Sequence, residues 1–171
     1  MLAMIWIFIV LIGIASVEGR TNASGVLLVN TIWSIAKSPI YITGNIGVPD
    51  NVRLTIEAGV QVIFPNNGNY QILVKGGSLT VRGSSKSSVR FIAQGLSDSN
   101  CMITFKGSQL SKSSFSYAYF EGPKGAICLQ NSADGLPQNA YTVRSEFVTF
   151  NRTTILAAGD LNKNGNNSKQ H

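Results

Sequence analysis

Acidic residues and histidine are scarce in this sequence. The 171 residues include 8 Asp and Glu against 14 Lys and Arg, and the one histidine, His171, ends the chain. A terminal side chain is poorly held. No two acids outside the first 19 residues are closer than seven positions, and no D-x-D, G-x-S-x-G, P-loop or zinc signature occurs. Stacked segments can still bring distant acids together, but the pattern predicts no catalytic residue, no cofactor and no metal.

Cysteine is almost absent. The chain has two, Cys101 and Cys128, and neither belongs to a C-x-x-C motif, so redox and zinc sites are disfavoured. In an oxidising compartment such a pair suggests one disulfide, which we predict here. The alternative is that both are small, buried apolar side chains.

Long apolar runs are missing except at the N-terminus. Residues 1–17 are almost wholly apolar and small residues follow, which predicts a secretory signal peptide, 1–19, cleaved after Gly19. The alternative is an uncleaved membrane anchor, since about 17 residues is the lower limit for a span. The expected location is therefore extracellular. Three glycosylation acceptor sequences fit it, and they begin at Asn22, Asn151 and Asn166.

The net charge is +6, and it rises to +7 when Glu18 leaves with the signal peptide. This excess favours anionic partners such as an acidic polysaccharide or a membrane surface. No basic helix or nucleic-acid motif is present, so nucleic acid is not expected as a partner. The alternative is that the basic residues only keep a β-rich surface soluble.

Helical periodicity is also missing from Ile40 onward. Short β-branched and aromatic runs alternate with Gly, Asn, Ser and Pro, which predicts short strands. Several runs end in a charge followed by glycine, as in "TIEAG", "LVKGG", "TVRG", "TFKG" and "YFEG". Glycine permits the left-handed backbone of a sharp corner. Alternation within the runs predicts an inner face that holds Ile56, Val74, Val81, Phe105 and Phe120. The positions before these, Thr55, Leu73, Thr80, Thr104 and Tyr119, should face water.

Strands that follow each other through tight corners favour a parallel β-helix over an antiparallel sandwich, which would need regular hairpin signals. We expect an all-β chain with a signal peptide at 1–19, an N-terminal cap segment at 20–39, a right-handed parallel β-helix at 40–157 and a disordered tail at 158–171. The form of residues 26–35, helix or strand, is left open. Cysteines 27 residues apart would then sit on adjacent coils.

A family resemblance supports this fold. Residues 38–93 resemble the opening coils of right-handed β-helix domains in the pectin-lyase-like superfamily, most closely the non-catalytic extracellular repeats of bark beetle-type animal junction proteins. The matching features include Trp33, Ser38-Pro39, "LTIEAGVQVIF" at 54–64, "GGSLTVRG" at 76–83 and "VRFIA" at 89–93. "FSYAYFEG" at 115–122 looks like a later coil. The resemblance implies a fold and leaves the function open.

The expected function is a secreted, non-enzymatic β-helix module with a structural or adhesive role. One form of this expectation is that the chain is the N-terminal part of a larger protein. One alternative is a relative of a polysaccharide lyase or glycoside hydrolase. Another is a module that binds an anionic glycan on a basic edge made by Lys75, Arg82 and Lys106. The partner is then an extracellular protein or an anionic glycan. Because the tail cannot cap the last coil, self-association through the open C-terminal edge is also expected.

Overall fold

The chain folds almost entirely into short strands. The computed structural model describes residues 19–95, 101–106, 112–130, 142–153 and 156–157. In these ranges one short 3-10 helix, η1 (Ile35–Lys37), interrupts the strands. The strands are β1 (Thr21–Val26), β2 (Thr31–Trp33), β3 (Ile40–Val48), β4 (Arg53–Glu57), β5 (Gln61–Phe64), β6 (Ile72–Val74), β7 (Ser78–Arg82), β8 (Val89–Ala93), β9 (Cys101–Lys106), β10 (Lys112–Ser116), β11 (Ala118–Glu121), β12 (Gly125–Gln130), β13 (Thr142–Glu146), β14 (Thr149–Asn151) and β15 (Leu156–Ala157).

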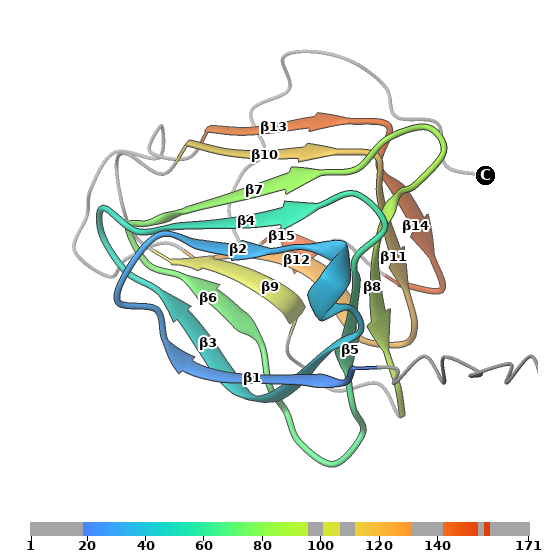
Figure 1. Cartoon of the computed structure of the whole chain (residues 1–171), viewed down its shortest axis with the longest axis horizontal. Helices are drawn as coiled ribbons and strands as arrows, with labels where there is room; N and C mark the ends of the chain where they lie inside the picture. The colour runs from blue at the N-terminus through green and yellow to red at the C-terminus, as the bar shows by residue number, and fades with distance from the viewer. Residues whose placement is uncertain (1–18, 96–100, 107–111, 131–141, 154–155, 158–171) are drawn as a thin grey trace, which may run out of the picture.

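All strand pairings among the described residues are parallel. Successive coils place β5, β8, β11 and β14 on a first face, β6, β9, β12 and β15 on a second, and β4, β7, β10 and β13 on a third. The long strand β3 bends across the first two faces, because Ile40 pairs with Val62 and Ile46 with Ile72. Figure 1 shows the third face as a ladder from β2 to β13. The predicted parallel β-helix is confirmed, and the sandwich is excluded.

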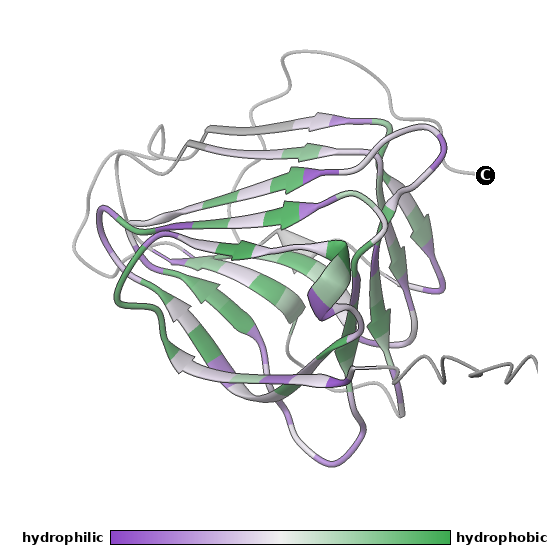
Figure 2. Ribbon diagram, in the orientation of Figure 1, coloured by the Kyte–Doolittle hydropathy of each residue, from purple (hydrophilic) through white to green (hydrophobic). Residues whose placement is uncertain are grey.

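The core is a set of side-chain rows that run along the stack. Ile40, Val62, Phe91 and Phe120 occupy matching positions on successive coils of the first face, and all are fully buried. The rings of Phe91 and Phe120 stack with centroids 4.7 Å apart. The residues predicted to point inward are all no more than 1% exposed, namely Ile56, Val74, Val81, Phe105 and Phe120. Figure 2 shows the same alternation as apolar bands across the strands.

Two positions expected to face water are buried instead. Thr104 is 2% exposed and Thr55 is 8% exposed. The hydroxyl of Thr104 donates a hydrogen bond to Oε1 of Gln71, which belongs to the preceding coil. The alternation of the side chains is right at this strand, but the expected solvent exposure of Thr104 is wrong because a neighbouring coil satisfies its polar group.

The segment 20–39, expected as a cap, supplies the first paired strands of the stack. β1 pairs with β3 and β2 pairs with β4, both in parallel. Trp33 at the end of β2 lies in line with Ile56 and is 5% exposed, so this coil shares the core. Of the proposed signal peptide only Gly19 is described, and the whole proposed tail, 158–171, with Asn166, lies outside the described residues. No helix in the described part of the chain is long and apolar enough to cross a membrane.

Candidate functional site

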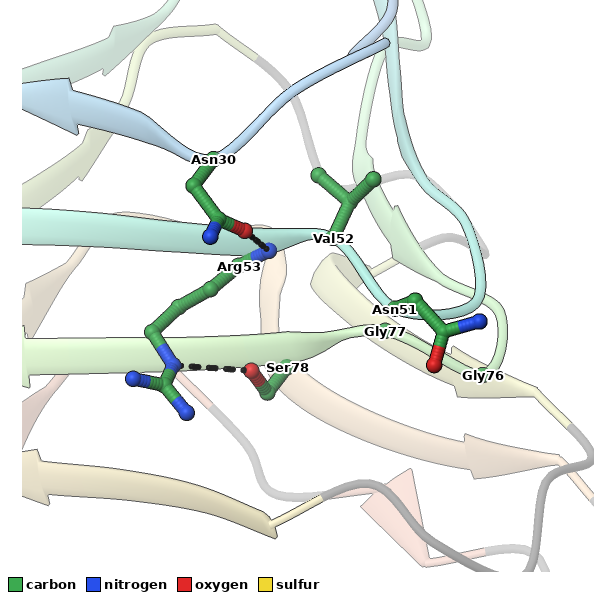
Figure 3. Close-up of a pocket in the computed structure, with 7 residues that line it drawn as sticks. All are labelled: Asn30, Asn51, Val52, Arg53, Gly76, Gly77 and Ser78. Atoms are coloured by element: carbon green, nitrogen blue, oxygen red, sulfur yellow. Dashed lines mark hydrogen bonds between the residues drawn. The ribbon is translucent and has the colours of Figure 1, made fainter.

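A polar pocket lies at the corner between the second and third faces, before β4 and β7 begin. It has a volume of about 270 Å³. We call it the corner pocket and define it by its lining residues, which are Asn30, Asn51, Val52, Arg53, Gly76, Gly77 and Ser78. They come from three successive coils (Figure 3). Val52 supplies the one apolar side chain of this set, so the pocket is suited to a polar ligand.

Backbone conformation forms the corner. Asn51 and Gly76 have φ values of 62° and 83°, in the left-handed region that turns the chain sharply. Gly77 is required for a different reason: a Cβ there would lie 2.6 Å from the carbonyl oxygen of Val52. The coil that contains Gly77 can therefore approach the coil that contains Val52 closely only with glycine at this position. Close approach of these two coils brings Ser78 next to Arg53.

Hydrogen bonds tie Arg53 to both neighbouring coils. Its Nε donates to Oγ of Ser78 at 3.3 Å, and its backbone N–H donates to Oδ1 of Asn30 at 2.8 Å. Neither the two Nη groups of Arg53 nor Nδ2 of Asn30 has a partner among the described residues. These N–H groups are available donors at the surface of the corner pocket.

The structure separates Arg82 from Lys75 and Lys106, the other two residues of the predicted basic edge. Val74 and Phe105 are register partners, so Lys75 and Lys106, which follow them, lie on adjacent coils at one corner. Lys75 also adjoins Gly76 of the corner pocket. Arg82 is on the third face, where it pairs in register with Glu57 and Ser116. Lys75 and Lys106 therefore share one corner, and Lys75 borders the pocket that Arg53 lines.

One carboxylate shares this corner. The side chain of Asp50 packs against Gly76, in the space that a Cβ at that glycine would occupy. Three cations and one anion therefore surround the corner, and the local balance is positive. The mixture supplies donors for acidic groups and an acceptor for hydroxyl groups. Among the described residues, no group of three or more His, Cys, Asp or Glu could hold a metal ion.

The sequence-based search missed Arg53, Asn30 and Ser78. The charged residues singled out in the sequence lie at the ends of strands, whereas Arg53 begins β4 and Ser78 begins β7. The three residues are 23 to 25 positions apart, and this regular spacing was the available signal. Polar residues recurring once per coil at a strand start mark a row on the folded surface.

The other acids of the described ranges lie apart from the corner pocket. Glu121 accepts a hydrogen bond from Nη2 of Arg90 at 3.0 Å, on the first face. Glu57 and Glu146 lie at the ends of third-face strands, in line with Arg82 and Ser116. Three further acids, Asp98, Asp134 and Asp160, are outside the described residues. The expectation of a chain without catalytic residues stays a prediction.

The two described glycosylation acceptors differ in environment. Asn22 is exposed in β1, where an attached glycan has room. Asn151 is half-buried, and its Nδ2 donates to the hydroxyl of Tyr119 at 2.9 Å. The hydroxyl of Thr153, the third residue of that acceptor sequence, donates to the carbonyl oxygen of Lys124 at 2.6 Å. Glycosylation at Asn151 would have to accommodate this contact with Tyr119.

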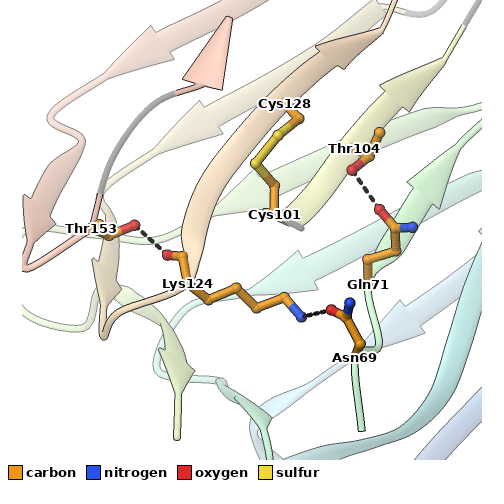
Figure 4. Close-up of a disulfide and its surroundings, with 7 residues drawn as sticks. All are labelled: Asn69, Gln71, Cys101, Thr104, Lys124, Cys128 and Thr153. Atoms are coloured by element: carbon orange, nitrogen blue, oxygen red, sulfur yellow. Dashed lines mark hydrogen bonds between the residues drawn. A yellow bond between two sulfur atoms is a disulfide. The ribbon is translucent and has the colours of Figure 1, made fainter. Parts of the chain in front are cut away.

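Cys101 and Cys128 form a disulfide between β9 and β12, which are neighbours on the second face (Figure 4). Their Cα atoms are 5.7 Å apart, within the range that disulfides occupy. Lys124 lies nearby, is 4% exposed and donates from Nζ to Oδ1 of Asn69 at 3.0 Å. The disulfide joins two coils that are already paired through their backbones.

Comparisons with protein-family models, with curated proteins and with solved structures found no match for this chain. The parallel β-solenoid therefore rests on the strand pairings described above. The finer resemblance, to bark beetle-type repeats of the pectin-lyase-like superfamily, stays a prediction from the residues that carry it.

Proposed function

We propose that this chain is a secreted, non-enzymatic adhesive module that holds an acidic glycan at the corner pocket. The observation that carries the proposal is the Arg53 side chain, positioned by Ser78 and with both Nη groups available. A guanidinium matches the geometry of a carboxylate or sulfate group, to which it donates two parallel hydrogen bonds.

The neighbouring groups suit the rest of a sugar unit. Amides of Asn30 and Asn51 and the carboxylate of Asp50 can exchange hydrogen bonds with sugar hydroxyls. The volume of about 270 Å³ is slightly below the range of about 300–1,000 Å³ typical of small-molecule pockets. One sugar unit therefore occupies the pocket, and the chain of the glycan continues outside it.

The positions of Lys75 and Lys106 indicate the direction in which the bound glycan would continue. They lie on successive coils, which are about 4.8 Å apart, beside the corner pocket. A glycan that runs along the stack meets Arg53 first and then the two ammonium groups. Binding through such exposed charges weakens as salt rises, because ions screen them over about 8–10 Å at 0.1–0.15 M.

The family proposal supports this function only in outline. The run 38–93 is similar to non-catalytic extracellular β-helix coils, and residues 1–19 read as a secretory signal. We therefore place the chain in the pectin-lyase-like superfamily, near the bark beetle-type repeats, and assign it a structural or adhesive extracellular role.

Binding of the secreted protein to glycans that carry carboxylate, sulfate or no charge tests the proposal. Arg53→Gln should weaken binding of acidic glycans about tenfold or more, since a hydrogen bond to a charged group contributes about 1.5–3 kcal/mol. The matched control is Arg82→Gln, an exposed arginine that ends a strand away from the corner.

Equal losses in the two variants would remove the corner pocket from the proposal, as would a preference for uncharged glycans. Release of unsaturated or reducing sugar ends from the bound glycan would contradict the non-enzymatic assignment. In that case the alternative, a carbohydrate-active β-helix enzyme, would replace it.

A further inference from the structure

Large exposed apolar side chains gather at the N-terminal end of the stack. Val26, Leu28, Val29, Ile32 and Ile35 are 64%, 86%, 69%, 53% and 60% exposed. We call these five residues the N-terminal apolar face. In the described part of the chain one other large hydrophobic residue, Phe147, is comparably exposed. Figure 2 shows the apolar colour on the loop that joins β1 to β2.

These side chains project outward from the first coil: Ile32 alternates with the buried Trp33 on β2, and Cδ1 of Ile35 lies beside Gly59 of the next coil. β1 and β2 are the first strands of their faces, and each pairs with one neighbour, β3 or β4. Trp33 anchors β2 in the core at 5% exposure, so the exposed aliphatic residues belong to a coil that is itself packed. Outward apolar side chains on a fixed coil indicate a surface built to contact something.

The charged residues of the first coil itself are cations, while Glu57 of the next coil lies opposite Ser34, beside Ile35. Residues 19–49 contain no Asp or Glu, and their two charged residues are Arg20 and Lys37. Nζ of Lys37 donates to the carbonyl oxygen of Ile32 at 3.2 Å, which places an ammonium beside the apolar face. The guanidinium of Arg20 lies over the ring of Tyr41, 4.0 Å from its centroid.

Aliphatic side chains on a coil whose own charges are Arg20 and Lys37 fit an anionic lipid surface. The aliphatic groups enter the boundary between head groups and acyl chains, and the cations contact lipid phosphates. The unpaired edges of β1 and β2 stay hydrogen-bonded to water and head groups, because they need not enter the hydrocarbon.

We propose that the N-terminal apolar face rests on the surface of an anionic phospholipid bilayer. The proposal is independent of the glycan function, because Arg53 and the corner pocket take no part in it. It holds whether or not residues 1–19 are removed, since the contact is made by residues 26–37. The stack then stands with its first coil on the membrane.

Quenching by brominated lipids tests this contact in the full chain. An environment-sensitive fluorophore is attached in the variant Ile35→Cys, and in Phe147→Cys as the matched control at another exposed apolar site. Vesicles contain phosphatidylcholine alone or with phosphatidylserine. Quenching is expected at position 35 and not at position 147, and it should be stronger with phosphatidylserine and weaker in high salt.

A second pair of variants separates the apolar contact from any tether by residues 1–18. Adding Leu28→Ser and Val29→Ser to the labelled chain should weaken vesicle binding about tenfold or more, because two exposed aliphatic side chains no longer enter the bilayer. Lys37→Ser should reduce the preference for phosphatidylserine. All variants keep their melting temperature, since the changed side chains are exposed.

Equal quenching at positions 35 and 147 would overturn the proposal. So would quenching at position 35 that the serine pair leaves unchanged, because a tether alone would then explain it. A dimer that the serine pair dissociates, with no quenching by lipid, would assign the N-terminal apolar face to a second copy of the chain instead.

Discussion

Among single residues of this protein, buried aromatic side chains should contribute most to the free energy of unfolding. Phe105 is fully buried and meets Phe115 edge to face, with centroids 6.4 Å apart. Phe105 also lies in line with Val74 on the coil before. Replacing such a side chain removes packing from two coils at once, and the adjacent backbone pairing limits how far the site can collapse.

Phe105→Ala should therefore lower the free energy of unfolding by about 3–5 kcal/mol. Thr104→Ala beside it should cost about 1 kcal/mol, which is the usual contribution of one hydrogen bond, here the bond to Gln71. Urea titration of both variants gives the two values. Equal costs at the two positions would contradict the inward and outward alternation along β9.

Alternation made the inward residues predictable, because a strand repeats every two residues whatever its neighbours are. Ile56, Val74 and Phe120 follow from that rule alone. The burial of Thr104 does not, since it depends on Gln71, 33 residues earlier in the chain. A local pattern gives the direction of a side chain, and the neighbouring coil decides whether water reaches it.

At the corners between strands, glycine is required for one of two reasons, a positive φ or a lack of space for a Cβ. Glycines after a charge at Gly59, Gly76 and Gly122 have positive φ, as the corner pattern predicted. Gly83 has no positive φ, and a Cβ there would lie 2.8 Å from the carbonyl oxygen of Ser116, so space is the constraint. Gly107 is outside the described residues.

Other corners use no glycine at all. Tyr117 and Phe147 have φ values of 49° and 54°, and their rings stack with centroids 4.6 Å apart. Nothing in the sequence marks these two residues as left-handed. The corner pocket was unpredictable for a related reason: the register of β2, β4 and β7 had to be known before Asn30, Arg53 and Ser78 could be placed together.

The disulfide is a covalent link between the strands β9 and β12. It closes a loop with a sequence separation of 27 between Cys101 and Cys128. A loop of this length restricts the unfolded chain enough to contribute about 3 kcal/mol. Replacing both cysteines with serine should lower the urea midpoint accordingly and leave the circular dichroism spectrum unchanged. A midpoint that does not move would show that the bond is absent or without energetic weight in the protein.

At the scale of the whole molecule, stability should depend on position along the stack. Among the residues that the structure describes, β4 and β7 each pair on both sides, whereas β1 and β13 each pair on one side. Local opening needs fewer broken contacts at an end than in the middle.

Amide exchange followed by mass spectrometry should therefore show a gradient. Peptides that contain 53–57 and 78–82 should exchange last, and those that contain 21–26 and 142–146 should exchange first. Uniform protection would indicate that the stack opens as one cooperative unit. Membrane contact, as proposed above, should slow exchange in 21–26 and leave 142–146 as it was, because only one end is covered.

The fold class was predictable because many weak signals agreed along the chain. Short β-branched runs, sharp corners and missing hairpin dipeptides all favoured a solenoid. How the coils divide into faces was not predictable. β3 serves two faces without a break; Gly44 and Asn45 lie between the residues that pair with β5 and those that pair with β6, but such a pair indicates a bend without telling which faces it joins. The strands within 20–39, a segment expected as a cap, were also not predictable, because they exist through pairing with β3 and β4.

The adhesive role proposed above implies mechanical load, and the disulfide determines how the chain would extend under it. The backbone hydrogen bonds between coils run along the stack, so a pull between its ends strains them one coil at a time. Unravelling from either end stops at the covalent tie between Cys101 and Cys128. About 27 residues then stay out of the extended chain, which is roughly 90 Å of length at 3.3–3.6 Å per residue. Under reducing conditions that hidden length becomes available, and the same molecule turns from a stiff link into a longer, softer one.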